Sequence, residues 1–297
     1  MKTKTVIIIL GPTASGKTSA AIEVAQHFNT HIISADSRQC YKELNIGVAK
    51  PSSEQLNAVT HYFINSHSIH DELNVKVFEE YALQKVNDIF QTKDVAIMVG
   101  GTGLYIKAFC EGIDEIPIIN TGIREAIIKN YNQNGLSWLQ DELSVLDPEY
   151  FATCEVQNPQ RLIRALEVKL STDRSILSFH TKIKKVRDFN IIKIGLELNK
   201  DKLYENINTR VDKMVKDGLI EEVKTLTPFQ SINALNTVGY QELFRYLNTE
   251  LSLSLAIAQI KSNTRHYAKR QITWFKKDAE IMWLPSHNIM TTLNGML

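Results

Sequence analysis

Uniformly apolar runs alternate with helix-length segments in the first hundred residues of the chain. These runs cover residues 5–10, 31–34 and 95–99, and one more run of this kind covers residues 191–198. Strands that are apolar at every position, instead of at every second one, are typical of a parallel sheet with helices on both faces. The pattern therefore predicts an α/β fold with a parallel sheet flanked by helices.

The segment between the last two runs has helical periodicity. Apolar residues are spaced for one helix face over residues 123–131, 136–143 and 161–170. Asp147-Pro148 and Asn158-Pro159 each place a turn residue and a proline just before a helical stretch. We therefore predict an inserted helical subdomain.

The sheet and the rest of the chain form the other predicted domain. After residue 198 the pattern is almost entirely helical, so we expect a helical C-terminal region. We place a discontinuous catalytic core at residues 1–114 and 190–297, and the helical insertion at residues 115–189.

Composition narrows the choice of partners and compartment. Lys and Arg total 34 against 33 for Asp and Glu, so the net charge alone does not favour a nucleic-acid partner. No apolar run approaches the roughly 18 residues of a membrane span. Cys40, Cys110 and Cys154 are too scattered for a disulfide framework or a zinc site. We expect a cytoplasmic protein that contacts no membrane and acts as a monomer.

The first apolar run leads directly into the sequence GPTASGKT at residues 11–18, which an Ala-rich helical stretch follows. This is the phosphate-loop pattern G-x-x-x-x-G-K-[ST], in which backbone N–H groups and a helix N-terminus surround phosphates, typically those of ATP. Lys17 is expected to bridge phosphate oxygens and Thr18 to ligate magnesium. The fold is thus expected to be P-loop NTPase-like, with phosphate-binding residues Gly11, Pro12, Thr13, Ala14, Ser15, Gly16, Lys17 and Thr18.

The run at residues 95–99 ends differently from its counterpart in a common nucleoside triphosphatase. It is followed by Gly100-Gly101-Thr102-Gly103 instead of the Asp that helps to hold magnesium and to position water. We interpret these glycines as letting another molecule approach the edge of the sheet closely. The missing carboxylate weakens a hydrolase interpretation.

One acid, Asp36 in IISADSRQCY, follows a predicted strand beside the phosphate loop. It suits a general base, or a magnesium ligand acting through water, and its alternative role is that of a turn or capping residue. Ser37, Arg38 and Gln39 come next and offer hydrogen-bonding groups to a polar partner.

Basic residues gather in two places despite the neutral total. The clusters consist of Arg161, Arg164, Lys169, Arg174, Lys182, Lys184, Lys185 and Arg187, and of Lys261, Arg265, Lys269, Arg270, Lys276 and Lys277. The second cluster alternates with aromatic side chains such as Tyr267 and Trp274. Either cluster suits a solvated helix face, and together beside a phosphate site they also suit an RNA backbone with stacked bases.

These features together resemble the tRNA dimethylallyltransferase family, also called tRNA isopentenyltransferases. The similarity runs through GPTASGKT at 11–18, ISADSRQ at 33–39 with Tyr41, IGVAKP at 46–51, VGGTGLY at 99–105, NPQRLIRALEV at 158–168, R-V-D-K-M-x-x-x-G-L at 210–219, GYQE at 239–242 and YAKRQITWF at 267–275. The eukaryotic members' C-terminal zinc finger has no counterpart in the sequence, so the resemblance is to the bacterial type. Val48 stands where many relatives have Thr.

The resemblance implies an activity. A dimethylallyl group would pass from dimethylallyl diphosphate, with Mg²⁺, to N6 of the adenine at position 37 in tRNAs reading codons that begin with U. The phosphate loop would hold the diphosphate, and because no water needs activating, the missing strand-end Asp is accounted for.

The resemblance also implies roles for individual residues. Asp36 is the expected base, Thr18 and Arg210 are the other catalytic residues, and the base to be modified is flipped out of the anticodon stem-loop. The implied tRNA-binding residues are Asp36, Ser37, Arg38, Gln39, Thr102, Arg124, Gln160, Arg161, Leu162, Ile163 and Arg164.

Three alternatives stay open at this point. An adenylate isopentenyltransferase uses the same donor with a free adenine nucleotide, although the basic insertion has less purpose there. A small-molecule kinase is compatible with the phosphate loop but not favoured by the glycine turn at residues 100–103. A non-catalytic RNA-binding module is disfavoured by Asp36 beside a complete phosphate loop.

Overall fold

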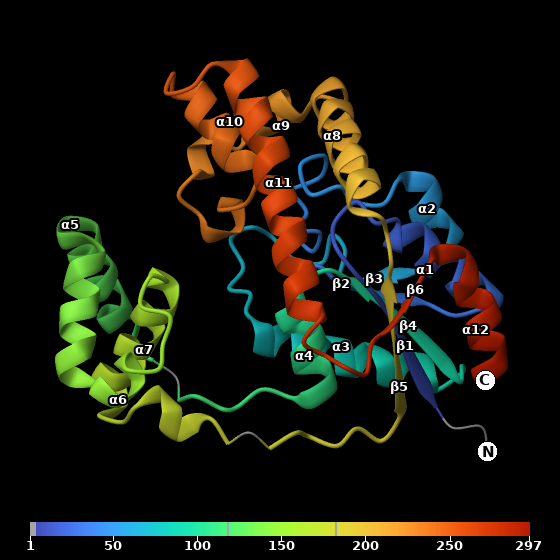
Figure 1. The fold of residues 1–297 in the computed structure, drawn as a ribbon, viewed down its shortest axis with the longest axis horizontal. Coiled ribbons are helices and arrows are strands. Elements are labelled where there is room, and N and C mark those ends of the chain that lie inside the picture. The colour runs from blue at the N-terminus through green and yellow to red at the C-terminus, as the bar shows by residue number, and fades with distance from the viewer. Residues whose placement is uncertain (1–3, 118, 182) are drawn as a thin grey trace. The chain divides into compact units, whose positions relative to one another are not determined.

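The computed structural model describes residues 4–117, 119–181 and 183–297, and Figure 1 shows the course of the chain. Lys182 of the first basic cluster lies outside the described residues. The chain divides into two compact units, one made of residues 1–111 and 186–297 and the other of residues 112–185. The second unit corresponds to the predicted insertion at residues 115–189, with bounds that differ by three and four residues. Each unit is described by itself.

The first unit is built on a six-stranded sheet in the order β3-β2-β4-β1-β5-β6. All the pairings are parallel. The strands are β1 (Thr5–Leu10), β2 (Ile32–Ala35), β3 (His61–Tyr62), β4 (Val95–Gly100), β5 (Asn190–Leu196) and β6 (Met282–Leu284). The predicted parallel α/β sheet is therefore confirmed.

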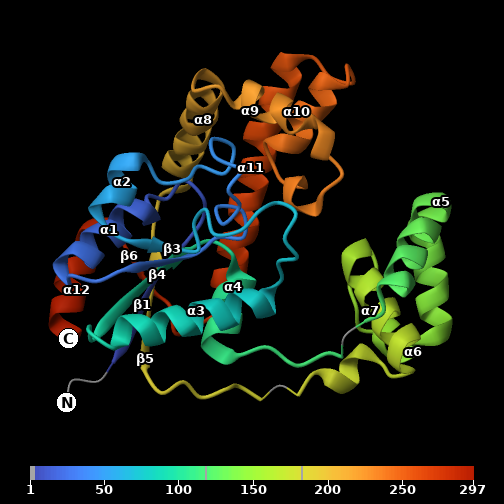
Figure 2. The same cartoon turned by 180° about the vertical axis from the view of Figure 1, so that it is seen from behind.

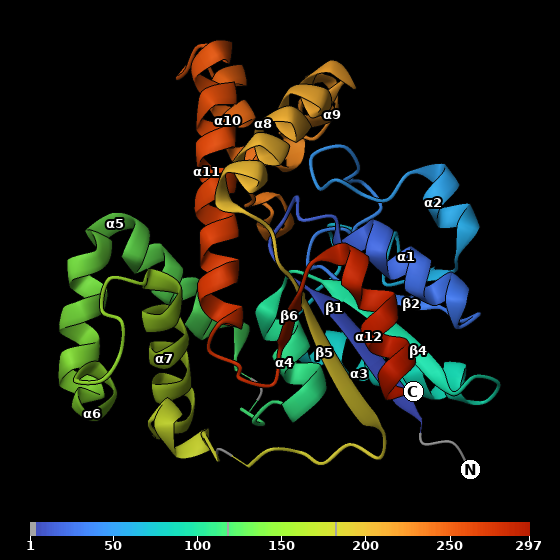
Figure 3. The same ribbon diagram turned by 45° about the vertical axis from the view of Figure 1, so that its right-hand side comes forward.

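Helices cover both faces of this sheet, as Figures 1 and 3 show. Ile7 and Ile9 of β1 pack with α1 (Lys17–His27) and α12 (Ile289–Met296). Val6 and Ile8 point to the other face and join the core with α3 (Val75–Phe90) and α4 (Gly103–Glu111). Both sets are fully buried. A strand that packs against helices on both faces needs apolar side chains at every position, which explains the unbroken run.

The remaining helices of this unit follow β2 and β5 in the chain. They are α2 (Ser53–Ala58), α8 (Lys200–Lys216), α9 (Leu219–Thr225), α10 (Tyr240–Leu247) and α11 (Leu253–Phe275), with short 3-10 turns at Thr227–Phe229, Asn233–Leu235 and Ser286–Asn288. Figure 2 shows α8, α9, α10 and α11 grouped beyond one edge of the sheet. The predicted helical C-terminal region is confirmed.

Strand register brings the functional segments to one edge. Leu10 at the end of β1 pairs with Gly100 of β4, and Gly100 also pairs with Ala35 of β2. The residues that follow these three strands are the phosphate loop, the turn at residues 101–103 and Asp36. Because the strands are parallel, all three segments leave the sheet at its carboxyl edge.

The second unit is helical. It contains α5 (Thr121–Leu146), α6 (Pro148–Phe151), α7 (Pro159–Thr172) and a 3-10 turn at Ile176–Phe179. The two helices predicted within residues 123–143 are both part of α5, which bends at Gly135 (φ 75°, ψ −167°). Asp147 and Asn158 cap α6 and α7 through side-chain hydrogen bonds, as their position before proline predicts.

Some elements were not predicted or differ in length. The edge strands β3 and β6 span two and three residues and are only half-buried, so they carry no apolar run to recognise. The strand predicted at 191–198 ends at Leu196, because Asn199 already caps α8. Within the described ranges, no helix is long and apolar enough to cross a membrane.

Candidate active site

The phosphate loop connects β1 to α1 in a conformation suited to an anion. Gly11 (φ 147°), Ala14 (φ 64°) and Gly16 (φ 90°) all have positive φ. Gly16 is the N-cap of α1, and a Cβ there would meet nothing within 4 Å, so its backbone angle is what requires glycine. Successive N–H groups in such a loop, together with a helix N-terminus, converge on one point.

Two side chains of α8 donate hydrogen bonds to the phosphate loop, and Lys17 donates one within it. Arg210 donates from Nη1 to Thr13 Oγ1 at 3.1 Å, and Asn206 donates from Nδ2 to the Ala14 carbonyl at 3.2 Å. Lys17 donates from Nζ to the Pro12 carbonyl at 2.6 Å. The predicted Arg210 therefore lies at the phosphate loop, although 192 residues separate it from Thr18 in the sequence.

Electrostatics favour an anion here. Burial lowers the pKa of Lys17 to about 7, with a further lowering by Arg210 and an opposing effect of Asp36. Burial likewise lowers the pKa of Arg210, and the charge of Asp36 again opposes the shift. Two desolvated cations side by side are costly unless an anion joins them. A diphosphate supplies that charge.

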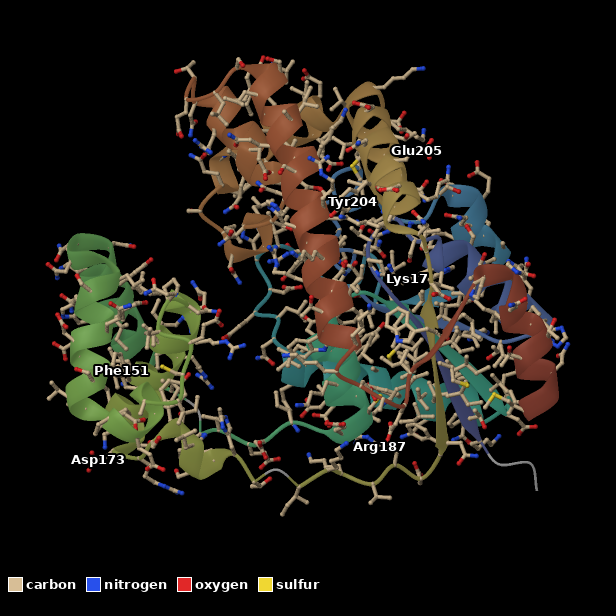
Figure 4. The ribbon with its side chains drawn as sticks, viewed as in Figure 1. Lys17, Phe151, Asp173, Arg187, Tyr204 and Glu205 are labelled. Carbon is tan, nitrogen blue, oxygen red and sulfur yellow. The ribbon has the colours of Figure 1, made fainter. Side chains whose placement is uncertain are left out.

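A cavity of about 1000 Å³ opens beside the loop. Its walls come from the phosphate loop, the carboxyl ends of β2 and β4, the segment 45–55, α8 and α11. Lys17 and Asp36 both line it, as do Glu205 of α8 and Tyr267 of α11. Lys17 and Glu205 are labelled in Figure 4. The volume is in the range of small-molecule sites.

Asp36 has the turn role that the sequence left open, and it also lines the cavity. Its Oδ1 accepts hydrogen bonds from the N–H groups of Arg38 (2.9 Å) and Gln39 (3.2 Å), which is a turn of the Asx type. These bonds fix the carboxylate at the cavity wall, and neither of them uses Oδ2. The charge of Asp36 also contributes, after burial, to raising the pKa of Tyr267 to about 12.

The residues after Asp36 contact Thr102 and the 46–51 segment. Ser37 donates its N–H to Thr102 Oγ1 at 3.1 Å. Gln39 donates from Nε2 to the carbonyls of Val48 (3.3 Å) and Ala49 (3.0 Å). The structure thus brings Thr102 next to Ser37, as expected of a shared surface, while the Gln39 side chain braces the wall of the cavity.

The glycines of the turn after β4 lie in close contact with other parts of the same chain. A Cβ on Gly100 would lie 2.2 Å from the Ala35 carbonyl oxygen, one on Gly101 2.2 Å from Gln271 Nε2, and one on Gly103 2.2 Å from Trp274. These glycines are therefore needed for the close approach of β2 and α11 of the same chain, and Gly100 and Gly101 also line the cavity.

Two further groups shape the site without having been predicted. Glu222 of α9 accepts the N–H groups of Ile46 (2.7 Å) and Gly47 (3.0 Å), which fixes the segment that closes one side of the cavity. Gln271 of α11 accepts the Thr13 N–H at 2.8 Å. Gln271 lies within YAKRQITWF, one of the motifs that carry the family resemblance, so that motif was the available signal for it.

The other predicted tRNA-binding residues belong to the helical unit. Gln160 and Arg161 lie exposed in the first turn of α7. Arg124 (2.7 Å) and Arg164 (3.3 Å) both donate to the buried Glu167, and both stay partly exposed. Leu162 and Ile163 are buried in the core of this unit, so their side chains are not offered to a partner.

Arg187 was assigned to the first basic cluster, and the structure corrects this. Its guanidinium donates to Glu79 at 2.9 Å and to the carbonyls of Ala108 and Phe109 (Figure 4). Both partners of the ion pair are nearly buried, so Arg187 is a core residue of the first unit.

Comparison with known proteins identifies the family. Residues 39–278 match the family model described as IPP transferase, which is most of the chain. The chain belongs to the IPP transferase family. The resemblance seen in the sequence motifs is thereby confirmed.

Relatives within the IPP transferase family are similar over almost their whole length. The tRNA dimethylallyltransferase of Christiangramia forsetii is 50% identical over 277 residues, covering 93% of this chain and 92% of the relative. The tRNA dimethylallyltransferase 1 of Phocaeicola vulgatus is 45% identical over 279 residues, covering 94% and 93%.

Solved structures agree with this membership. The full-length tRNA isopentenylpyrophosphate transferase from Bacillus halodurans is 33% identical, with a TM-score of 0.72 over 99% of this chain and 95% of that one. A eukaryotic dimethylallyltransferase acting on tRNA, 23% identical, has a TM-score of 0.81 over 99% and 78% of the two chains. At that identity the second likeness shows the fold alone.

Proposed function

We propose that this protein transfers a dimethylallyl group from dimethylallyl diphosphate to N6 of an adenine in tRNA, releasing diphosphate. The observation that supports the proposal is that the phosphate loop, Arg210 and the carboxylate of Asp36 line one cavity. The names of the IPP transferase relatives support the same substrates. The adenine is that at position 37, in tRNAs reading codons that begin with U.

The reaction is a substitution at the first carbon of the allyl group. The N6 lone pair forms the new C–N bond, the C–O bond to the diphosphate breaks, and one N6 proton passes to Asp36. Lys17 and Arg210 stabilise the charge that grows on the leaving diphosphate. Because an exocyclic amine is a weak nucleophile, holding both substrates in contact away from water supplies much of the rate.

Magnesium fits the residues present. Ser15 Oγ is buried and has no hydrogen-bond partner in the described part of the chain, and the Thr18 hydroxyl lines the same cavity. Hydroxyl oxygens and a diphosphate are ligands that Mg²⁺ accepts. Thr18 would hold the ion directly and Asp36 through water, and the ion would neutralise diphosphate charge.

On the acceptor side, we assign the anticodon stem-loop to the edge formed by Asp36, Ser37, Arg38 and Thr102. In the helical unit we assign it to the exposed side chains of Gln160, Arg161, Arg164 and Arg124. The protein acts on tRNA as a monomer in the cytoplasm.

An isotope-transfer assay tests the proposal. Labelled dimethylallyl diphosphate and Mg²⁺ are incubated with an anticodon stem-loop containing adenine at position 37, or with AMP. We expect label in the stem-loop alone. Label in AMP alone would replace the proposal with nucleotide prenylation, and ATP consumption without any transfer would replace it with a kinase.

A further inference from the structure

Gln271 is a buried residue of α11 that forms a hydrogen bond with the phosphate loop. Its Oε1 accepts the N–H of Thr13 at 2.8 Å. Its Nε2 donates to the carbonyl of Gly101 at 2.9 Å. The orientation of the amide follows from chemistry, because a backbone N–H only donates and a carbonyl only accepts.

The Gln271 side chain occupies space that is free because residue 101 is a glycine. Gly101 has no Cβ, and one there would lie 2.2 Å from Gln271 Nε2. Glycine is not needed at this position for a left-handed φ, because none of the positive-φ residues is Gly101. The close approach of Gln271 is therefore what requires glycine at residue 101.

Thr13 is held twice, and both bonds come from the C-terminal helices. Gln271 of α11 takes its N–H, and Arg210 of α8 donates to its hydroxyl at 3.1 Å. Thr13 is one of the loop residues that line the cavity, and so is Gln271. A loop whose N–H groups must converge on an anion gains affinity when its conformation is fixed in advance.

We propose that Gln271 is a positioning residue that locks the phosphate loop to the glycine turn and thereby sets the affinity for the diphosphate of the donor. The inference rests on the proposed function for the identity of the donor, but the lock acts on any diphosphate. Gln271 touches no reacting atom in this account.

The test is calorimetric binding of inorganic pyrophosphate with Mg²⁺, which does not depend on prenyl transfer. Gln271→Met keeps the length of the side chain but leaves the Thr13 N–H and the Gly101 carbonyl unpaired. We expect its pyrophosphate Kd to rise about tenfold, equivalent to about 1.4 kcal/mol. Gln259→Met on the same helix, remote from the cavity, is the matched control and should bind like wild type.

Gln271→Glu makes the pyrophosphate Kd depend on pH in a way that a loss of packing alone would not. An ionised carboxylate still accepts from Thr13 but faces the Gly101 carbonyl with no proton, whereas a protonated one restores both bonds. We expect the ratio of its Kd to that of wild type to fall toward one as the pH is lowered. Gly101→Ala disturbs the same contact by adding a Cβ next to Gln271, and it should weaken pyrophosphate binding as well.

Steady-state kinetics complete the test. In Gln271→Met the KM for dimethylallyl diphosphate should rise while the KM for the stem-loop stays within about twofold of wild type. The proposal is overturned if folded Gln271→Met binds pyrophosphate as wild type does, or if the deficit of Gln271→Glu does not change with pH. Absence of transfer by wild type would instead refute the proposed function, and the pyrophosphate result would still decide the role of Gln271.

Discussion

The buried Lys17 makes diphosphate binding a proton-uptake reaction. Burial lowers the pKa of Lys17 to about 7, and the charge of Arg210 contributes to this shift. A bound diphosphate favours the charged ammonium, so binding returns the pKa toward the ordinary lysine range near ~10.4. At pH values above 7 the free protein must therefore take up a proton when pyrophosphate binds.

The size of the effect follows from the shift. With a pKa of about 7, Lys17 is about one-tenth protonated at pH 8 and about nine-tenths protonated at pH 6. Uptake by Lys17 should thus be about 0.9 proton at pH 8 and about 0.1 proton at pH 6. Through this group alone, the affinity for pyrophosphate falls about tenfold from pH 6 to pH 8.

Calorimetry in buffers of different ionisation enthalpy measures that proton. Pyrophosphate itself titrates in this range, so the comparison is with Lys17→Arg, whose guanidinium stays charged and takes up nothing. The difference between wild type and Lys17→Arg isolates the Lys17 proton. Equal uptake by the two proteins at pH 8 would refute the reasoning that burial leaves Lys17 largely neutral there.

Three further outcomes follow from particular contacts. Arg187→Met leaves the buried Glu79 without its hydrogen-bonded cation, with only the partly exposed Lys76 at 3.8 Å, so the free energy of unfolding in urea should fall by about 3 kcal/mol; a loss below about 1 kcal/mol would contradict this, and Glu79→Gln in the same chain should recover part of it. Glu222→Gln replaces one of the two accepting oxygens with an NH2 group that only donates. It therefore loses either the bond from Ile46 N–H to Oε2 or the bonds from Gly47 N–H and the Tyr240 hydroxyl to Oε1. Unfolding should cost about 2 kcal/mol less and proteolysis near residues 46–51 should become faster; unchanged cleavage would show that another contact fixes this segment. Thr18→Val should raise the Mg²⁺ concentration needed for half-maximal transfer whereas Thr18→Ser should not, and equal behaviour of the two variants would remove Thr18 as a ligand.

The parts of this protein that local sequence describes were predictable. Strands β1 and β4 have unbroken apolar runs at residues 6–10 and 95–99 because both faces of the sheet are covered, whereas Lys193 interrupts the run in β5 and is buried through ion pairs with Asp278 and Glu280. The phosphate loop is a contiguous pattern between a strand and a helix. Asp36 was placed correctly because it directly follows a strand whose carboxyl end lies beside that loop.

The parts that depend on distant contacts were not predictable. Gln271 reaches Thr13 across 258 residues, and Glu222 reaches Ile46 across 176, so no local pattern announces either bond. The same reason explains why the contacts of the glycine turn within the chain were not predicted. Its glycines are explained by the approach of Ala35, Gln271 and Trp274, and only the fold places those residues there.

Single-turnover transfer by Asp36→Asn tests the central claim most directly. The amide keeps an oxygen that accepts the turn hydrogen bonds but is no longer a base, so both pyrophosphate and the stem-loop should still bind. With both substrates bound, we predict that transfer to the stem-loop is slower by about 10²–10⁴-fold than in wild type. Transfer at the wild-type rate would contradict the account, because proton removal by Asp36 would then have no part in the reaction.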